Sequence, residues 1–287
     1  DKSWIYYDKI YGDEVFGSRF YTSIYAELLG AGITYEYKNY HVPYLLKFLS
    51  NPPIAYREGT SILASRNAHS MNFGNEVGHQ IDINKTMFND VNVSLNLSLA
   101  HRQDLENRGS IQLMDVLSMK EENEVYVHYP FRQIYLEMNG WTLSDQLYYK
   151  LGLDDFTEFT IVGSTTKQTY ATTIPTQWVW KFNSGNSLTV YFELQNKTEK
   201  ILTDDHVLSN ETKYDNYYVS SSYGHGGKIV LTGFYDQEIK DGKSETWIGA
   251  DLSYELTTET LVSFFYGSQK GGLVCANGIC AEQPGFE

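Results

Sequence analysis

The residues that could do chemistry are acidic pairs and a neighbouring histidine. Asp205 and His206 adjoin in the run Asp204-Asp205-His206, and Asp154 is followed by Asp155. A carboxylate beside an imidazole can act as a general base. Adjacent residues of a strand point to opposite faces, however, and an acidic pair in a loop is usually solvated. The sequence has no phosphate-binding loop, dinucleotide fingerprint, EF-hand or zinc spacing. It therefore predicts no enzyme, no cofactor and no metal site.

The two cysteines, Cys275 and Cys280, flank a predicted tight turn. Asn277-Gly278 lies between them, and Asn-Gly favours a type I′ turn because both central residues need positive φ. In such a hairpin the cysteines occupy opposed positions, where their Cβ atoms lie within reach of a disulfide. A metal or redox site is the alternative, but the spacing is not Cys-x-x-Cys and no histidine lies nearby. We therefore expect a disulfide and an oxidising compartment.

The elements that must position these groups are predicted strands in which apolar and polar residues alternate strictly. In two segments the apolar positions are Val91, Val93, Leu95, Leu97, Leu99 and Leu188, Val190, Phe192, Leu194. The residues between them are mostly polar, and 248–256 repeats the pattern. A charge at the bilayer midplane costs roughly 2–4 kcal/mol, so lipid demands one uncharged face. We predict that these apolar side chains face lipid, although a soluble edge strand can show the same pattern.

Composition narrows the class of protein further. The net charge of −14 argues against nucleic-acid binding, which needs a basic surface. The chain has 24 Tyr against 6 Pro, which suits strands and membrane interfaces. No run of roughly 18 apolar residues is present, so no membrane helix is expected. A barrel remains open because its strands hide their apolarity by alternation.

The lengths of the connections favour a transmembrane barrel. Counting back from an expected final strand, long connections such as 41–75 and 101–124 fall outside, and short ones fall on the periplasmic side. Residues 138–156 break this rule, and 144–151 read as a short helix with Ser144 as N-cap. We predict an all-β, antiparallel transmembrane β-barrel with about twelve strands. Residues 1–287 form one domain, interpreted as a fragment without its N-terminal part and final strand.

A long connection holds the candidate residues for a loop or partner contact. They are Tyr44, Leu45, Phe48, Pro52, Pro53, Tyr56, Arg57 and Arg66. One interpretation folds the segment into the barrel mouth, where Arg57 or Arg66 pairs with carboxylates. The other keeps it at the surface, stiffened by Pro52-Pro53. Apolar and aromatic residues exposed on such a loop mark a contact site.

Two segments resemble a known family. Gly271–Cys280, with the pattern Gly-Gly-Leu-Val-Cys-x-Asn-Gly-x-Cys, resembles the C-terminal hairpin of an uncharacterised outer-membrane β-barrel family of Bacteroidetes-type bacteria. Residues 51–80, beginning Asn51-Pro52-Pro53, are also similar to that family, and the likeness covers most of the chain. Ala281 departs from it, because members carry a basic residue after the second cysteine. The resemblance implies a barrel in a bacterial outer membrane and transfers no activity.

Three functions follow as alternatives. The first is a structural or docking role, in which the barrel contacts outer-membrane lipid and other outer-membrane or surface proteins. The second is a porin-like or gated channel for a solute or polypeptide, since a barrel of this size is wide enough for a lumen. The third is a secreted β-sandwich that binds glycan through Tyr and Trp. The uncharged face of 91–100 disfavours the third.

Overall fold

Thirteen strands form one antiparallel sheet in which each strand pairs with its neighbours in sequence. The computed structural model describes residues 2–11, 16–41, 57, 61–72, 75–87, 90–102, 113–118, 128–162, 165–183, 185–203, 208–257, 259–276, 279–283 and 285. For 2–11, 16–18, 162, 183, 272–276 and 279–283 it describes the backbone alone. The prediction of an all-β antiparallel fold is confirmed.

The bounds of the elements show how much of the chain is strand. The main sheet consists of β1 (Lys2–Tyr11), β2 (Phe16–Leu28), β3 (Ala31–His41), β4 (Asn75–Thr86), β5 (Asn92–His101), β6 (Phe131–Thr142), β7 (Leu147–Val162), β8 (Thr165–Asn183), β9 (Asn186–Leu202), β10 (Leu208–His225), β11 (Ile229–Lys240), β12 (Lys243–Thr257) and β13 (Thr260–Gly267). The short helices are α1 (Ile62–Ser65) and α2 (Leu113–Ser118). The strands β14 (Gly272–Ala276) and β15 (Ile279–Gln283) form a separate hairpin.

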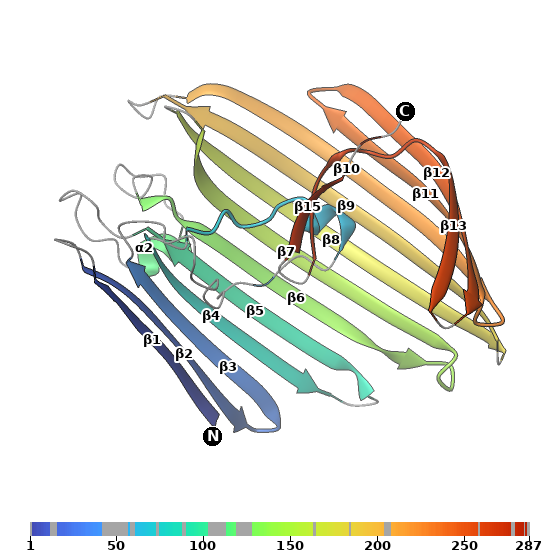
Figure 1. Ribbon diagram of the computed structural model, residues 1–287, viewed down its shortest axis with the longest axis horizontal. Helices are drawn as coiled ribbons and strands as arrows, with labels where there is room; N and C mark the ends of the chain where they lie inside the picture. The colour runs from blue at the N-terminus through green and yellow to red at the C-terminus, as the bar shows by residue number, and fades with distance from the viewer. Residues whose placement is uncertain are drawn as a thin grey trace.

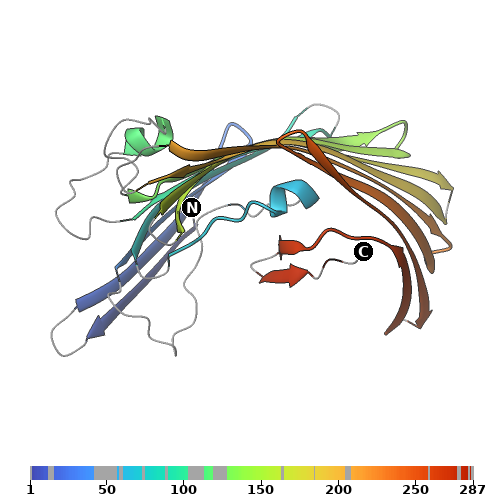
Figure 2. The ribbon, with the colours of Figure 1, turned by 90° about the horizontal axis from the view of Figure 1, so that it is seen from above.

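The sheet is strongly curved, and its two faces differ in environment. Figure 2 shows α1 and the β14–β15 hairpin on the concave side of the arch. β1 and β13 are the two edges of the sheet and are not paired with each other (Figure 1). Alternation along each strand sends successive side chains to the concave and convex faces. The described strands therefore form an open, curved sheet.

The connections at one end of the sheet are short. Leu29-Gly30 joins β2 to β3, with φ of 52° and 72°. Gly226-Gly227 turns between β10 and β11 with φ of 61° and 69°. Paired positive φ angles match the right-handed twist of the flanking strands. The longest gaps between strands, after β3 and after β5, both lie at the other end of the sheet.

The helix predicted over residues 144–151 is wrong. Leu143 to Asp145 form a tight turn with φ of 53°, 54° and 64°, and β7 begins at Leu147. Leu147 pairs with β6 on one side and with β8 on the other. In this segment Leu147, Tyr149 and Leu151 alternate with Tyr148 and Lys150, which is a strand pattern. Pairing on both sides outweighs the local capping signal of Ser144. The connection that seemed long at the sequence level is therefore short.

The C-terminal hairpin does not extend the main sheet. β14–β15 is a separate sheet on the concave side (Figure 2). The chain leaves the main sheet at Gly267, whose φ is 129°. A Cβ at this position would lie 2.3 Å from the carbonyl oxygen of Ile248. Only glycine permits this backbone conformation and close approach, so Gly267 directs the chain inward.

Packing is concentrated where the chain folds back onto the concave face. A buried cluster joins Ala100, Phe131, Phe156 and Ala171 from four strands, and Met71 packs against it. On the convex side, Arg132 of β6 donates to the carbonyl of Leu117 in α2, 3.1 Å away.

Neither helix in the described part of the chain is long and apolar enough to cross a membrane.

Candidate functional site

The chain from Ser61 to Asn72 crosses the concave face of the sheet, and Arg57 lies on that face too. We call Arg57 and residues 61–72 the inward segment. Ser61 caps α1, because its Oγ accepts a hydrogen bond from the backbone N–H of Ala64 at 3.3 Å. A serine in this position stabilises the first turn of a helix. The short helix packs on β8, β9 and β10 and on the hairpin strand β14.

Glu193 of β9 holds the start of α1. Its carboxylate accepts hydrogen bonds from the backbone N–H groups of Ile62 at 3.0 Å and Leu63 at 2.8 Å. Gln195, two residues further along the same face, donates to the carbonyl of Leu63 at 2.9 Å. Glu193 is only 1% exposed. Its charge is therefore held by directed donors in a buried place, and such hydrogen bonds are stronger than neutral ones.

Arg66 ties the end of α1 to β11. Its guanidinium pairs in a forked arrangement with both carboxylate oxygens of Asp236, one of them at 3.2 Å from Nη1. Asp236 is buried on the concave face. Removing one partner of a buried ion pair leaves an uncompensated charge and costs about 3–5 kcal/mol. The Arg66–Asp236 pair therefore fixes the position of α1 over the sheet.

His69 lies between two carboxylates. Its Nδ1 is 2.7 Å from Glu158 of β7, and its Nε2 is 3.3 Å from Glu76 of β4. The ring stacks on Phe131 with centroids 4.0 Å apart. Burial by itself lowers the pKa of His69, but the charge of Glu76 and the hydrogen bond to Glu158 outweigh it and raise that pKa. Glu76 also forms an ion pair with Lys38.

Two backbone N–H groups that come after His69 in the sequence donate hydrogen bonds to the same two carboxylates. The N–H of Ser70 donates to Glu158 at 2.7 Å, and the N–H of Asn72 donates to Glu76 at 2.7 Å. Each carboxylate thus receives both a side-chain and a backbone contact from the segment. This arrangement positions the backbone of the segment as well as its side chains.

Arg57 makes a separate contact over β5 and β6. Its backbone N–H donates to Ser98 at 3.3 Å, and its guanidinium lies 4.0 Å from the ring centroid of Tyr135. The same guanidinium is 3.7 Å from Glu137 and 4.0 Å from Asp82. Arg57 and Arg66 are therefore both paired with carboxylates of the concave face. This agrees with the interpretation that folds the segment inward.

The chemistry of the inward segment is that of docking. At these contacts the segment mostly supplies donors, and the sheet supplies carboxylates from β4, β6, β7, β9 and β11. Within the described ranges no group of three or more His, Cys, Asp or Glu could hold a metal ion. The residues brought together are suited to holding a segment of chain across a polar face.

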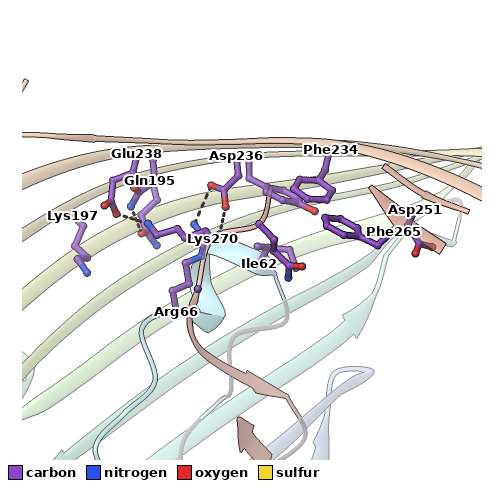
Figure 3. Close-up of a pocket in the computed structure, with 14 residues that line it drawn as sticks. Ile62, Arg66, Gln195, Lys197, Phe234, Asp236, Glu238, Asp251, Phe265 and Lys270 are labelled. Atoms are coloured by element: carbon purple, nitrogen blue, oxygen red, sulfur yellow. Dashed lines mark hydrogen bonds and ion pairs between the residues drawn. The ribbon is translucent and has the colours of Figure 1, made fainter. Parts of the chain in front are cut away.

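A cleft of about 520 Å³ remains beside α1 and the chain that follows β13. It is lined by Ile62, Arg66, Gln195, Lys197, Asn216, Tyr218, Phe234, Asp236, Glu238, Asp251, Phe265, Gln269, Lys270 and Gly271. Figure 3 shows Arg66 and Lys270 reaching towards Asp236 and Glu238 from the two segments that fold inward. Lys270 and Glu238 form an ion pair of 2.5 Å. The concave face is therefore covered only in part.

Most predicted lipid-facing residues lie on the convex face. Val93, Leu95, Leu97, Leu188, Val190, Phe192 and Leu194 alternate with the residues that contact the inward segment. Leu99 differs, because it is 4% exposed at the end of β5 on which α2 packs. Val91 lies before β5 and accepts a hydrogen bond from Met87 at 2.7 Å in the turn. Leu99 is therefore buried by protein instead of facing lipid, and Val91 lies in the turn that precedes β5.

The remaining predicted residues are those of the long connection, the acidic pairs and the two cysteines. Tyr44, Leu45, Phe48, Pro52, Pro53, Tyr56 and the run 204–206 lie outside the described residues. Asp154 and Asp155 point to opposite faces, since Asp154 pairs with Gln133 and Asp155 with Arg132. The register places Cys275 opposite Cys280, as the turn predicts. Their side chains lie outside the described part, so the disulfide stays a prediction.

Sequence reasoning did not identify which carboxylates receive the inward segment. Glu76, Glu158, Glu193 and Asp236 are acidic residues at concave positions of four different strands. The alternation of each strand places its carboxylate on the face opposite the apolar residues, and this was the signal that could have drawn attention to it. Their partners could not be assigned, because the contacts to Glu193 and Asp236 span 131 and 170 residues of sequence.

Comparison with known proteins adds one result. No curated protein and no solved structure matches the chain. Residues 36–287 match DUF6029, a family of unknown function, and this match extends from within β3 past the hairpin. It includes the inward segment and all of its carboxylate partners. The chain therefore belongs to the DUF6029 family.

Proposed function

We propose that this chain belongs to a β-barrel of a bacterial outer membrane whose lumen is occluded by its own inward segment. Its role is then structural or partner-docking at the cell surface, and not that of an open pore. The observation that supports this most is the set of buried pairs between the inward segment and the concave face. A passage for solutes would be blocked where α1 lies.

The convex face supports a location in lipid. One row of paired positions from β5 to β12 is Val93, Met138, Leu151, Thr176, Phe192, Val219, Tyr235 and Ile248. A second row from β7 to β13 is Leu147, Trp180, Leu188, Tyr223, Leu231, Leu252 and Phe264. Neither row contains a charged residue. Apolar surface of this extent calls for lipid or another protein to cover it.

The docking role rests on the long connections. Residues 42–56 are rich in apolar and aromatic side chains, among them Tyr44, Leu45 and Phe48. Both long connections emerge at the end of the sheet opposite the short turns. In a barrel with periplasmic short turns, that end faces outward. The partners would then be other outer-membrane or surface proteins.

A gated channel is the second candidate, and the cleft beside Arg66 favours it. If the inward segment moves, the polar concave face becomes a path. The β-sandwich alternative has little support, because the second sheet among the described residues has only two strands.

Conductance in planar lipid bilayers separates the two candidates. We expect little steady conductance from the protein as it stands, and large conductance from Glu193→Gln/Asp236→Asn, which weakens two anchors on the sheet. The matched control is Glu211→Gln, whose partner Lys213 is exposed. Steady large conductance of the unaltered protein, with recovery free of any partner from gently solubilised membranes, would rule out the docking role.

A further inference from the structure

The cleft beside α1 has a row of aromatic rings along one wall. Tyr218 and Phe234 have ring centroids 6.4 Å apart with planes inclined by 19°, and Phe234 and Phe265 are 6.1 Å apart at 14°. The three residues come from β10, β11 and β13 and all line the cleft. Neighbouring rings this close to parallel make one continuous apolar wall. Such a wall gives a ligand contact area without charge.

Gly249 lets two of these rings lie against the sheet. It is the register partner of Phe234 on β12. A Cβ at Gly249 would lie 2.6 Å from Cε1 and Cζ of Phe234 and 2.8 Å from Cε2 of Phe265. Both rings therefore lie over the glycine, in the space that a side chain at this position would fill, and both line the cleft.

Polar groups of the cleft can exchange hydrogen bonds with a ligand. Gln195 donates through Nε2 to Leu63 and Thr173, so its Oε1 must accept from Nδ2 of Asn216, 2.9 Å away. This chain of donors fixes the orientation of the Asn216 amide. Its Oδ1 is buried and receives no donor from the described residues. Buried acceptors are normally satisfied, so a hydroxyl of a bound molecule would complete this network.

The charges of the cleft balance. Its lining includes three cations, Arg66, Lys197 and Lys270, and three carboxylates, Asp236, Glu238 and Asp251. Arg66 and Lys270 are paired within the cleft with Asp236 and Glu238. An ionic ligand would have to break these pairs or meet like charge. The cleft is thus suited to an uncharged ligand that has both hydroxyl groups and an apolar ring face.

We propose that the cleft binds a neutral saccharide, with the C–H face of a sugar ring on Phe234 and Phe265 and its hydroxyls on Asn216 and Asp251. The volume of about 520 Å³ lies in the range of small-molecule sites. This activity goes beyond the docking role and does not depend on it. Binding can be measured in detergent, so its failure is distinguishable from failure of the membrane proposal.

The test uses the full chain in detergent and an array of neutral trisaccharides. The array holds α- and β-linked glucose, galactose, mannose and N-acetylglucosamine trimers, with trigalacturonate as the charged comparison. Hits are titrated by calorimetry. We expect at least one neutral trimer to saturate a single site. Phe234→Ala should weaken it about tenfold, because the burial of most of one apolar side chain is lost.

The matched control is Phe182→Ala, the same change on an exposed ring of β8 outside the cleft. It should leave the titration unchanged. Gly249→Ala provides a second variant that displaces both rings and should also weaken binding. Absence of binding to every neutral trimer would overturn the proposal, as would equal affinity in Phe234→Ala or tighter binding of trigalacturonate.

Discussion

His69 is the imidazole of the inward segment, and its pKa is raised from the ordinary value of about 6.5 by the carboxylates around it. It contacts Glu158 and Glu76 and lies on Phe131, and Lys38 reaches the same Glu76. The arginines of the segment stay charged at every accessible pH. Docking of the segment therefore depends on pH chiefly through this imidazole and the carboxylates around it.

The raised pKa of His69 gives the sign of that dependence. A group with a raised folded-state pKa contributes stability that is fully present below its unfolded value of about 6.5 and is lost as pH rises through the folded value. We expect hydrogen-exchange protection of the backbone amides of residues 62–72 to fall between about pH 6.5 and alkaline pH. His69→Asn should remove this change in protection. Protection that rises with pH, or that keeps its profile in His69→Asn, would contradict the assignment.

At the scale of single elements, alternation predicts strands well where it is strict. Residues 92–100 and 188–194 lie in β5 and β9, and their side chains alternate between the two faces as the pattern predicts. A local sequence signal is misleading where strand pairing opposes it. Ser144 has the pattern of a helix N-cap, but the residues after it form β7, which is hydrogen-bonded to β6 and β8. At Gly267 the departure of the chain from the sheet depends on its close approach to Ile248 of another strand, which no local pattern indicates.

The face assignment of β5 leads to a prediction about stability. Leu95 is 39% exposed on the convex face, and Ser94 next to it points to the concave face. In a folding titration in lipid vesicles, Leu95→Arg should lower the free energy of unfolding by roughly 2–4 kcal/mol if the residue lies near the midplane. Ser94→Arg places the same side chain on the polar face and is the control. Equal effects of the two changes would show that the convex face does not meet lipid.

At the scale of the whole molecule, the order of the strands could be predicted from the sequence. The position of the inward segment on the concave face could not. A chain of alternating segments joined by short turns leads to a meander, because neighbouring strands in sequence pair most readily. The position of α1 depends on carboxylates from strands far along the chain, whose proximity arises from the curvature of the finished sheet. The partners of Arg66 and Ile62 were therefore beyond sequence reasoning, although an inward segment was one of two interpretations.

The meander has a consequence for the order of assembly. Sheet pairing links near neighbours in sequence, whereas the inward segment closes loops of 131 and 170 residues to reach Glu193 and Asp236. Closing a long loop costs entropy that only finished contacts repay. The strands must also be in place before their carboxylates converge. We infer that residues 61–72 dock last, after the rate-limiting step.

Kinetics in lipid vesicles can test that order, because a contact absent from the transition state affects unfolding alone. Asp236→Asn should leave the folding rate unchanged and speed unfolding. Leu95→Arg, which disturbs a strand within the meander, should slow folding. Slower folding of Asp236→Asn would mean that the segment docks early and guides the sheet. A segment that docks last is also the first to leave, so the protein can open its concave face while the strands stay paired.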